Sequence, residues 1–241
     1  MQFVRIIKTM TEKEVSILLP SLRKDLVNQR IAEWATNNPT VNYELIIVSP
    51  FEVSGYNVTW LKENDRKGSV HATNIALNTA LGNYIIYFSD DVAPTKNCLR
   101  HMLDFMKAQE KHPFLGAFKM IFKNNRQIGP FGAYNRLYAC YGCISKEDLF
   151  SLSNILFRPE FLYSWGDIDL SLRIWEKDGE VKICEEAVVI PQQVEDDIYL
   201  AHRNTFKNDF ETFANKWHKK LGAGMERKDG AINRRLKLEL K

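Results

Sequence analysis

Short apolar runs that alternate with helical patterns constrain the fold of this chain more than any other feature. VSILLP (15–20), YELIIVSP (43–50) and NYIIYFS (83–89) are mostly apolar or aromatic, and each stops at a proline or a serine. Such runs are typical of strands buried on both faces of a sheet. Two segments with apolar residues at helical spacing, 23–38 and 68–82, lie between them. The alternation predicts an α/β fold with a mostly parallel central sheet flanked by helices.

The remaining segments extend this pattern. VTWLKEN (58–64) predicts a shorter strand, and the helix at 68–82 should begin with Ser69 as its N-cap and stop at Gly82. In the second half we expect strands at 114–124, 136–144 and 181–191, the first two as an antiparallel pair, and helices at 167–179 and 204–222. The last helix carries an aromatic stripe that we assign to packing, made of Phe206, Phe210, Phe213 and Trp217.

Length and composition bound the class of protein. A chain of 241 residues with 45% hydrophobic residues is large enough for one α/β domain with a real core. Its apolar runs fall short of the roughly 18 residues that span a bilayer, and its first residues lack the apolar region of a signal peptide. We therefore expect a cytoplasmic protein. Cys140 and Cys143 form a CxxC without the second ligand pair of a zinc site, so we expect two buried thiols.

Charge is concentrated at the end of the chain. Basic residues outnumber acidic ones between 216 and 241, although the net charge is only +3. Such a tail can contact an anionic membrane surface or a nucleic acid, or it can simply be a solvated end. No GxxxxGK[ST] loop is present, and no GxGxxG follows a strand, which argues against a P-loop enzyme and a dinucleotide dehydrogenase.

Two adjacent carboxylates, Asp90 and Asp91, end the strand at 83–89. Ligands of open α/β sheets bind at the carboxyl ends of the strands. Because like charges repel, the pair favours a cation beside it. Mg²⁺ takes one or two protein carboxylates and completes its shell with water and phosphate oxygens, which implies a nucleotide diphosphate. The alternative is that the pair only caps a turn and the helix that follows.

A second acidic motif is SWGDIDLSLRIWEKDG. Asp167 stands at a helix start, where the helix dipole favours its anionic form, and there it could act as a general base. The alternative is plain N-capping. Asp169 and Arg173 are four residues apart and can pair along the helix, so we expect Arg173 to be structural.

These motifs, taken in order, resemble the family 2 glycosyltransferases, inverting enzymes with the GT-A fold. The likeness runs from about residue 15 to 179 and rests on the NIALNTALGNYIIYFSDDV block and WGDIDLSLR. It implies a Rossmann-like nucleotide-diphospho-sugar transferase fold. The expected organisation is one domain over 1–222, with a nucleotide-sugar half (1–92), an acceptor and catalytic-base half (93–222), and a basic tail (223–241).

The resemblance also implies roles. Asp91 would bind the Mn²⁺ or Mg²⁺ that bridges the donor phosphates, with His202 as a further ligand. Asp167 would take a proton from the acceptor hydroxyl. Independently of the resemblance, aromatic rings stack on sugar faces and Trp165 adjoins Asp167, so we expect Trp165 to bind the acceptor. Many members carry an Asp after the second strand; this chain reads VSPFE there, so Ser49 or Glu52 would replace it. Many members also carry a Glu directly before the base, where this chain has Gly166. The implied donor-binding residues are Pro20, Ser21, Arg23, Ser49, Glu52, Arg66, Asn74 and Asp90, with Lys67 as an alternative to Arg66.

The function expected is therefore transfer of a sugar from a UDP-, dTDP- or GDP-linked donor to a glycan or lipid-linked acceptor. Cell-surface polysaccharide assembly is the expected setting, with the basic tail at the inner membrane face and no nucleic acid. A catalytically degenerate nucleotide-sugar-binding or scaffold protein is the alternative. A nucleotidyltransferase is disfavoured, because LPSLRKD has no glycine. The acidic residues 195–197 either cover the donor site or form a solvated turn.

Overall fold

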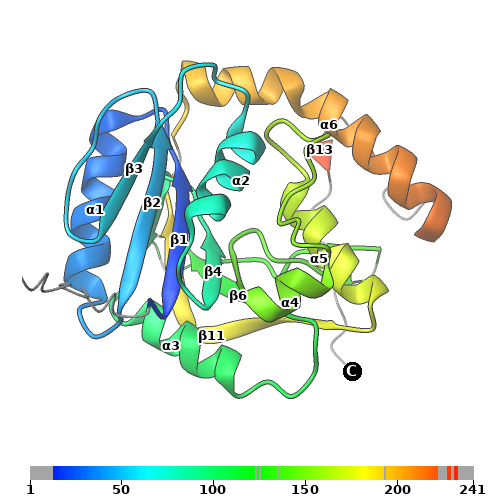
Figure 1. Ribbon diagram of the computed structural model, residues 1–241. Coiled ribbons are helices and arrows are strands. Elements are labelled where there is room, and N and C mark those ends of the chain that lie inside the picture. Colours follow the sequence, from blue (N-terminus) through cyan, green and yellow to red (C-terminus); the bar gives the residue numbers. More distant parts are fainter. Residues whose placement is uncertain are drawn as a thin grey trace, which may run out of the picture.

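A computed structural model describes residues 13–122, 124, 126–134, 136–192, 194–221, 227–228 and 231–232. One large sheet runs through the molecule in the order β3-β2-β1-β4-β10-β6-β11-β5, with β7 paired to β6 (Figure 1). Its strands are β1 (Val15–Pro20), β2 (Tyr43–Ser49), β3 (Val58–Lys62), β4 (Tyr84–Tyr87), β5 (Val92–Pro94), β6 (Phe114–Ile121), β7 (Gln127–Ile128), β10 (Gly142–Ser145) and β11 (Glu180–Pro191). Two short pairs lie outside it: β8 (Gly132–Ala133) with β9 (Arg136–Leu137), and β12 (Arg227–Lys228) with β13 (Ala231–Ile232).

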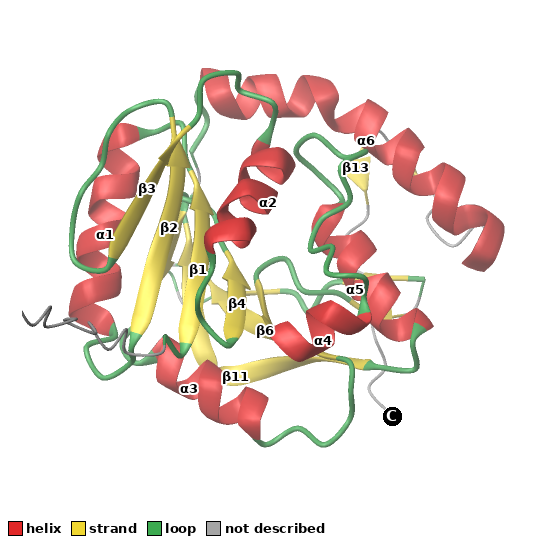
Figure 2. Ribbon diagram, in the orientation of Figure 1, coloured by secondary structure: helices red, strands yellow, loops and turns green. Residues whose placement is uncertain are grey.

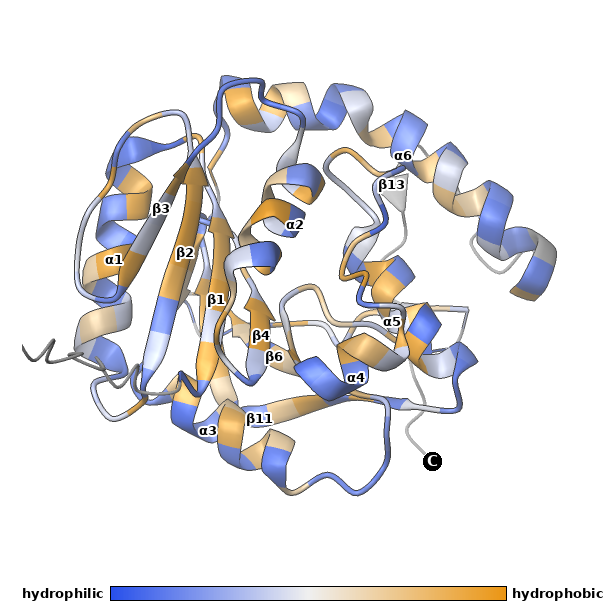
Figure 3. Cartoon of the chain, viewed as in Figure 1, coloured by the Kyte–Doolittle hydropathy of each residue, from blue (hydrophilic) through white to orange (hydrophobic). Residues whose placement is uncertain are grey.

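Helices cover both faces of this sheet (Figure 2). Along β1, Leu18 joins one hydrophobic cluster, while Ile17 and Leu19 join the other, as expected when side chains alternate between the faces of a buried strand. Figure 3 shows how apolar residues predominate in the central strands. The first cluster is covered by α2 (Ser69–Thr79), α4 (Lys146–Ser151), α5 (Gly166–Glu176) and α6 (Asp197–Leu221), and the second by α1 (Lys24–Asn37) and α3 (Cys98–Lys107).

The sheet is mixed, so the expectation of a mostly parallel sheet holds only for its first half. β3, β2, β1 and β4 are parallel neighbours, and β6 and β11 are also parallel. β10 runs antiparallel to both β4 and β6, and β5 runs antiparallel to β11. The expected antiparallel pairing is therefore confirmed for β6 and β10, although the strand expected at 136–144 is divided into β9 and β10. The chain returns from β6 to β10 without a crossover helix, so β10 runs against its neighbours.

The link between β4 and β5 shows that the sheet is curled. These strands are consecutive in the chain but four positions apart in the sheet, with β10, β6 and β11 between them. Four strand spacings in a flat sheet would cover about 19 Å. The chain from Tyr87 to Val92 can reach at most about 18 Å when fully extended. The sheet must therefore bend so that its far edge approaches β4, and residues 88–91 cross the gap.

The ends of α2 differ from expectation. Ser69 is the first helical residue, and Gly68 occupies the N-cap position with φ 102°. A side chain at Gly68 would place its Cβ 2.4 Å from the carbonyl oxygen of Leu162, so the cap is set by a distant loop. The helix ends at Thr79, before Gly82.

Several other expectations can be compared with the structure. In the aromatic stripe of α6, Phe213 and Trp217 are buried, which confirms the packing role. Cys143 is buried as expected, whereas Cys140 is only half-buried because it lies beside a cavity. Most of the basic tail at 223–241 lies outside the described residues. None of the helices in the described ranges combines the length and apolar character needed to cross a membrane.

Candidate active site

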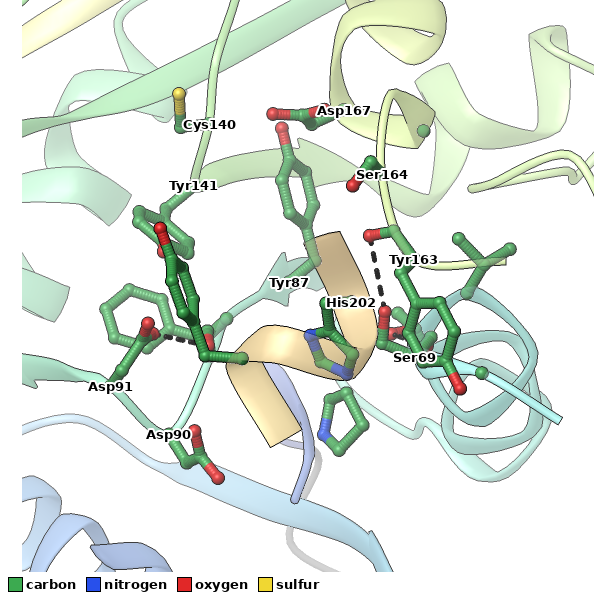
Figure 4. A pocket seen from close by; sticks show the side chains of 18 of the residues that line it. Ser69, Tyr87, Asp90, Asp91, Cys140, Tyr141, Tyr163, Ser164, Asp167 and His202 are labelled. Carbon is green, nitrogen blue, oxygen red and sulfur yellow. Dashed lines mark hydrogen bonds between the residues drawn. The ribbon is translucent and has the colours of Figure 1, made fainter. Parts of the chain in front are cut away.

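A cavity of about 1020 Å³ lies at the carboxyl ends of β1 and β4 (Figure 4). The residues that follow β1 and β4 line it, together with the first turns of α2, α5 and α6. This is the edge of the sheet at which the sequence predicted a ligand. Of the expected site residues, the cavity brings together Pro20, Ser21, Arg23, Arg66, Asp90, Asp91, Trp165, Asp167 and His202.

Asp90 lies buried at the end of the cavity that the residues after β1 and β4 form. It is 2% exposed, and both carboxylate oxygens are engaged within the protein. The Ser21 hydroxyl donates to one oxygen at 2.6 Å, and Arg23 Nη1 donates to the other at 2.9 Å. Burial raises the pKa of Asp90, although Ser21 and Arg23 oppose the rise. Asp90 thus holds the residues that follow β1 in place.

Arg23 also reaches α6. Its Nε and Nη2 donate to the two oxygens of Asp196 at 2.7 and 2.9 Å, a bidentate pair. Asp196 is in turn the N-cap of α6, because its Oδ1 accepts from the backbone N–H of Tyr199 at 2.9 Å. The pair raises the pKa of Arg23 and lowers that of Asp196. One guanidinium therefore joins the ends of β1 and β4 to the start of α6, a contact that the sequence did not reveal.

Asp91 and His202 are the candidate metal ligands. Asp91 accepts a hydrogen bond from the Ser89 hydroxyl, and His202 stacks on Tyr163 with ring centroids 4.2 Å apart. Burial, followed by the charge of Arg23, lowers the pKa of His202. The lowered pKa favours the neutral imidazole, which is the form that binds metals.

Within the described ranges, no group of three His, Cys, Asp or Glu side chains gathers as a metal cage. Two protein ligands suit a hard cation that takes its remaining ligands from phosphate and water. The residues present therefore fit a metal shared with a diphosphate.

Asp167 lies in the first turn of α5 and faces the same cavity (Figure 4). The N-cap position belongs to Trp165, which has φ 72°, so Asp167 is not the capping residue. Figure 4 shows the Tyr87 side chain extending toward Asp167, and Asp167 adds to the burial that raises the pKa of the Tyr87 hydroxyl. The Asp167 carboxylate therefore lies at the start of α5, where the helix dipole favours its charged form.

Two buried aspartates hold the segment around Asp167. Asp209 of α6 accepts from the backbone N–H groups of residues 162, 163 and 164, each at 2.9 Å. Asp169 accepts from Arg173 Nε at 2.9 Å, which confirms the expected pairing, and from Trp217 Nε1 at 2.9 Å. Sequence reasoning missed Asp209, because nothing local marks a carboxylate whose partners lie more than forty residues away.

Three of the residues expected to bind the donor lie outside the cavity. Ser49 donates to the carbonyl of Phe51 at 2.6 Å, and the Asn74 amide donates to the carbonyl of Phe157 at 2.8 Å. Glu52 is exposed, and none of Ser49, Glu52 and Asn74 lines the cavity.

Trp165 lines the cavity but is only 3% exposed. Its ring packs on three aromatic residues of α6, with centroids 4.8 to 5.3 Å away, which leaves little of its face for an acceptor. These are Phe206, Phe210 and Phe213.

Comparison with known proteins gives the context of this cavity. The model of the family described as Glycosyl transferase family 2 matches residues 16–160. Residues 1–349 of S. aureus TarS superpose with a TM-score of 0.60 at 13% identity, over 86% of this chain and 73% of that one. The TarS complex with UDP-GlcNAc gives 0.61 at 15% identity, over 76% of this chain and 60% of that one.

GalNAc-T7 with UDP, GalNAc and Mn²⁺ gives a TM-score of 0.60 at 12% identity, over 76% of this chain and 44% of that one. At these identities the likeness shows a shared glycosyltransferase fold. No curated protein matches the sequence.

Proposed function

Since this chain belongs to glycosyl transferase family 2, we propose that it moves a sugar from a nucleotide-diphosphate sugar to an acceptor hydroxyl with inversion. The observation that carries the proposal is that Asp91 and Asp167, from the two separate motifs, line one cavity at the carboxyl ends of the strands. A binding or scaffold protein would need only the donor end of this cavity.

Asp167 is the proposed catalytic base. It would take the proton of the acceptor hydroxyl, whose oxygen then attacks the anomeric carbon from the face opposite the nucleotide. The bond from that carbon to the donor phosphate breaks, and its electron pair leaves with the diphosphate. The start of α5 favours the ionised carboxylate that this step requires.

The donor would lie along the residues that follow β1. Arg23 and Ser21, which both hydrogen-bond to Asp90, would meet the nucleotide, and Asp91 with His202 would hold Mn²⁺ or Mg²⁺. A bound metal would supply Lewis-acid stabilisation of the leaving diphosphate. The TarS complex with UDP-GlcNAc and the GalNAc-T7 complex with UDP and Mn²⁺ make a UDP-linked donor and Mn²⁺ the first choices to test.

We also propose a setting for the reaction. The acceptor would be a glycan or lipid-linked molecule in cell-surface polysaccharide assembly, and the protein would work on the cytoplasmic side. The basic residues at 223–241 could hold it at an anionic membrane surface.

Calorimetric titration tests the donor site. UDP, GDP and dTDP would each be titrated with and without Mn²⁺ into the wild type, Asp91→Ala and the control Asp104→Ala, whose carboxylate lies on α3 outside the cavity. We expect one nucleotide to bind in a way that needs both Mn²⁺ and Asp91 but not Asp104. Absence of binding by all three nucleotides to folded wild type would contradict the donor site.

Asp167→Asn separates transfer from binding. We expect this variant to keep nucleotide affinity and to lose donor turnover, because only the base is removed. Turnover equal to the wild type would exclude Asp167 as the base. A wild type that binds donor but never turns it over, with any acceptor, would favour the degenerate binding protein.

A further inference from the structure

One side of the cavity is built from apolar side chains, which we call the apolar wall. It comes from the end of β6, from β7 and from the segments before and after β8 and β9. Four of its five side chains are half-buried, so part of each is open to the cavity. The apolar wall consists of Met120, Phe122, Ile128, Phe131 and Tyr141.

Backbone pairing and ring contacts fix the apolar wall in place. Met120 pairs with Ile128 across the β6–β7 ladder. Phe131 stacks on Tyr138 with centroids 5.7 Å apart, and its carbonyl accepts from the Tyr138 N–H at 3.1 Å. Tyr141 packs against Phe88 with centroids 5.2 Å apart. The wall is thus a built surface of the site.

Charge in the cavity is segregated from this wall. The ionised lining residues come from the ends of β1, β3 and β4 and from α5 and α6, and the five wall residues carry no formal charge. The wall nevertheless adjoins the candidate reacting groups, because Tyr141 lines the same cavity as Asp91 and Asp167 and packs against Phe88, three residues before Asp91. Figure 4 shows Cys140 and Tyr141 on one segment, which borders the same cavity as Asp167.

Binding of a polar sugar donor does not require an apolar surface of this kind. The nucleotide and its phosphates are matched by the charged end of the cavity, around Arg23 and Asp91. Met120 and Ile128 are aliphatic, and such side chains favour hydrocarbon over the hydroxyl-bearing face of a sugar. Partly exposed apolar surface beside a site is typical of ligand recognition.

We propose that the acceptor carries an apolar group next to its reactive hydroxyl and that this group seats on the apolar wall. The proposal rests on the proposed transferase function and specifies its acceptor class as an amphipathic molecule. The hydroxyl would face Asp167, while the hydrocarbon would run along β6 and β7.

A series of alkyl β-D-glucosides tests the wall with a constant head group. Methyl, butyl, hexyl and octyl glucosides, each below its micelle concentration, would be titrated into protein that holds UDP and Mn²⁺. Complete burial of a methylene strengthens binding about fourfold, so we expect a gain of about two- to fourfold per carbon. In Ile128→Thr and Phe131→Ser, the gain per carbon should fall toward one. Ile128→Thr keeps a β-branched residue in β7, so it also serves if Phe131→Ser fails to fold.

Phe150→Ser is the matched control. Phe150 is 79% exposed on α4 and does not line the cavity, so this variant should keep the wild-type gradient. A wild type without a gradient, or wall variants that keep it, would overturn the proposal. Equal binding of methyl and octyl glucosides would mean that the wall meets a sugar face instead. UDP affinity, measured on the same samples, reports separately on the donor site, so failure of the transferase proposal would be distinguishable.

Discussion

Asp169 ties the helix that carries the proposed base to the rest of the molecule. Its side chain is fully buried and meets Arg173 Nε and Trp217 Nε1, each at 2.9 Å, and Arg158 Nη1 at 3.4 Å. Two of these partners lie outside α5, one of them on α6. Removing the carboxylate by Asp169→Ala should therefore loosen α5 and α6 together.

The cost of this change can be estimated from its partners. Breaking a buried ion pair costs about 3–5 kcal/mol, because the remaining charge has no counterpart. Arg173 is 5% exposed but keeps hydrogen bonds to the carbonyls of Ile155 and Leu156, so the lower end applies. A loss of about 3 kcal/mol in the free energy of unfolding corresponds to a fall in Tm of roughly 6–12 °C for a chain of this size.

Urea unfolding followed by circular dichroism measures the free energy, and a thermal melt measures Tm. Asp104→Ala is the matched control, because Asp104 also pairs with an arginine four residues away, at 3.7 Å, but both side chains are partly exposed. It should cost less than about 1 kcal/mol. If the two variants lose the same stability within about 1 kcal/mol, burial is not the source of the effect and the reasoning is refuted.

Three further changes have defined outcomes. Asp196→Asn keeps an N-cap oxygen but removes the charge that faces Arg23, so hydrogen exchange in the first turns of α6 should accelerate. Asp197→Asn removes a carboxylate from the same first turn but leaves the Arg23–Asp196 pair intact, so it should accelerate exchange less, and equal rates in both variants would contradict the tether. Gly68→Ala should lower the free energy of unfolding by about 1–3 kcal/mol, because Gly68 has a positive φ and the Leu162 carbonyl lies against the added Cβ. An unchanged Tm in a thermal melt would contradict this explanation. Deleting 223–241 should reduce flotation with anionic but not with neutral liposomes, and identical flotation of both proteins would rule out the membrane contact.

The parts of the site that the sequence revealed are those marked by local patterns. Asp90 and Asp91 follow an apolar strand, and the carboxyl-end rule places them at the ligand edge of the sheet. Asp167 begins a helical segment, and the order of the motifs in the resemblance to family 2 put it in the same site. The pair of Arg23 with Asp196 joins residues 173 positions apart, and no pattern near either of them indicates the other.

The fold shows the same division. The runs that become β1, β2 and β4 are mostly apolar or aromatic, so their burial was predictable. The insertion of β10 between β4 and β6 and the glycine cap of α2 both depend on distant segments. At the start of α2, the carbonyl of Leu162 leaves room only for a glycine at position 68. The local preference of Ser69 for the N-cap position therefore could not predict where the helix begins.

The short link from β4 to β5 has a consequence for how this protein can vary. Most surface loops accept an inserted residue, because their length is not matched to a fixed distance. Residues 88–91 instead bridge two strands that are four places apart in the sheet, and they carry both carboxylates of the donor end. Their length therefore sets the curvature of the sheet and the spacing of its ligands at the same time. An insertion or deletion here would alter the shape of the whole molecule, whereas the connection between β6 and β7 could change length without moving Asp91.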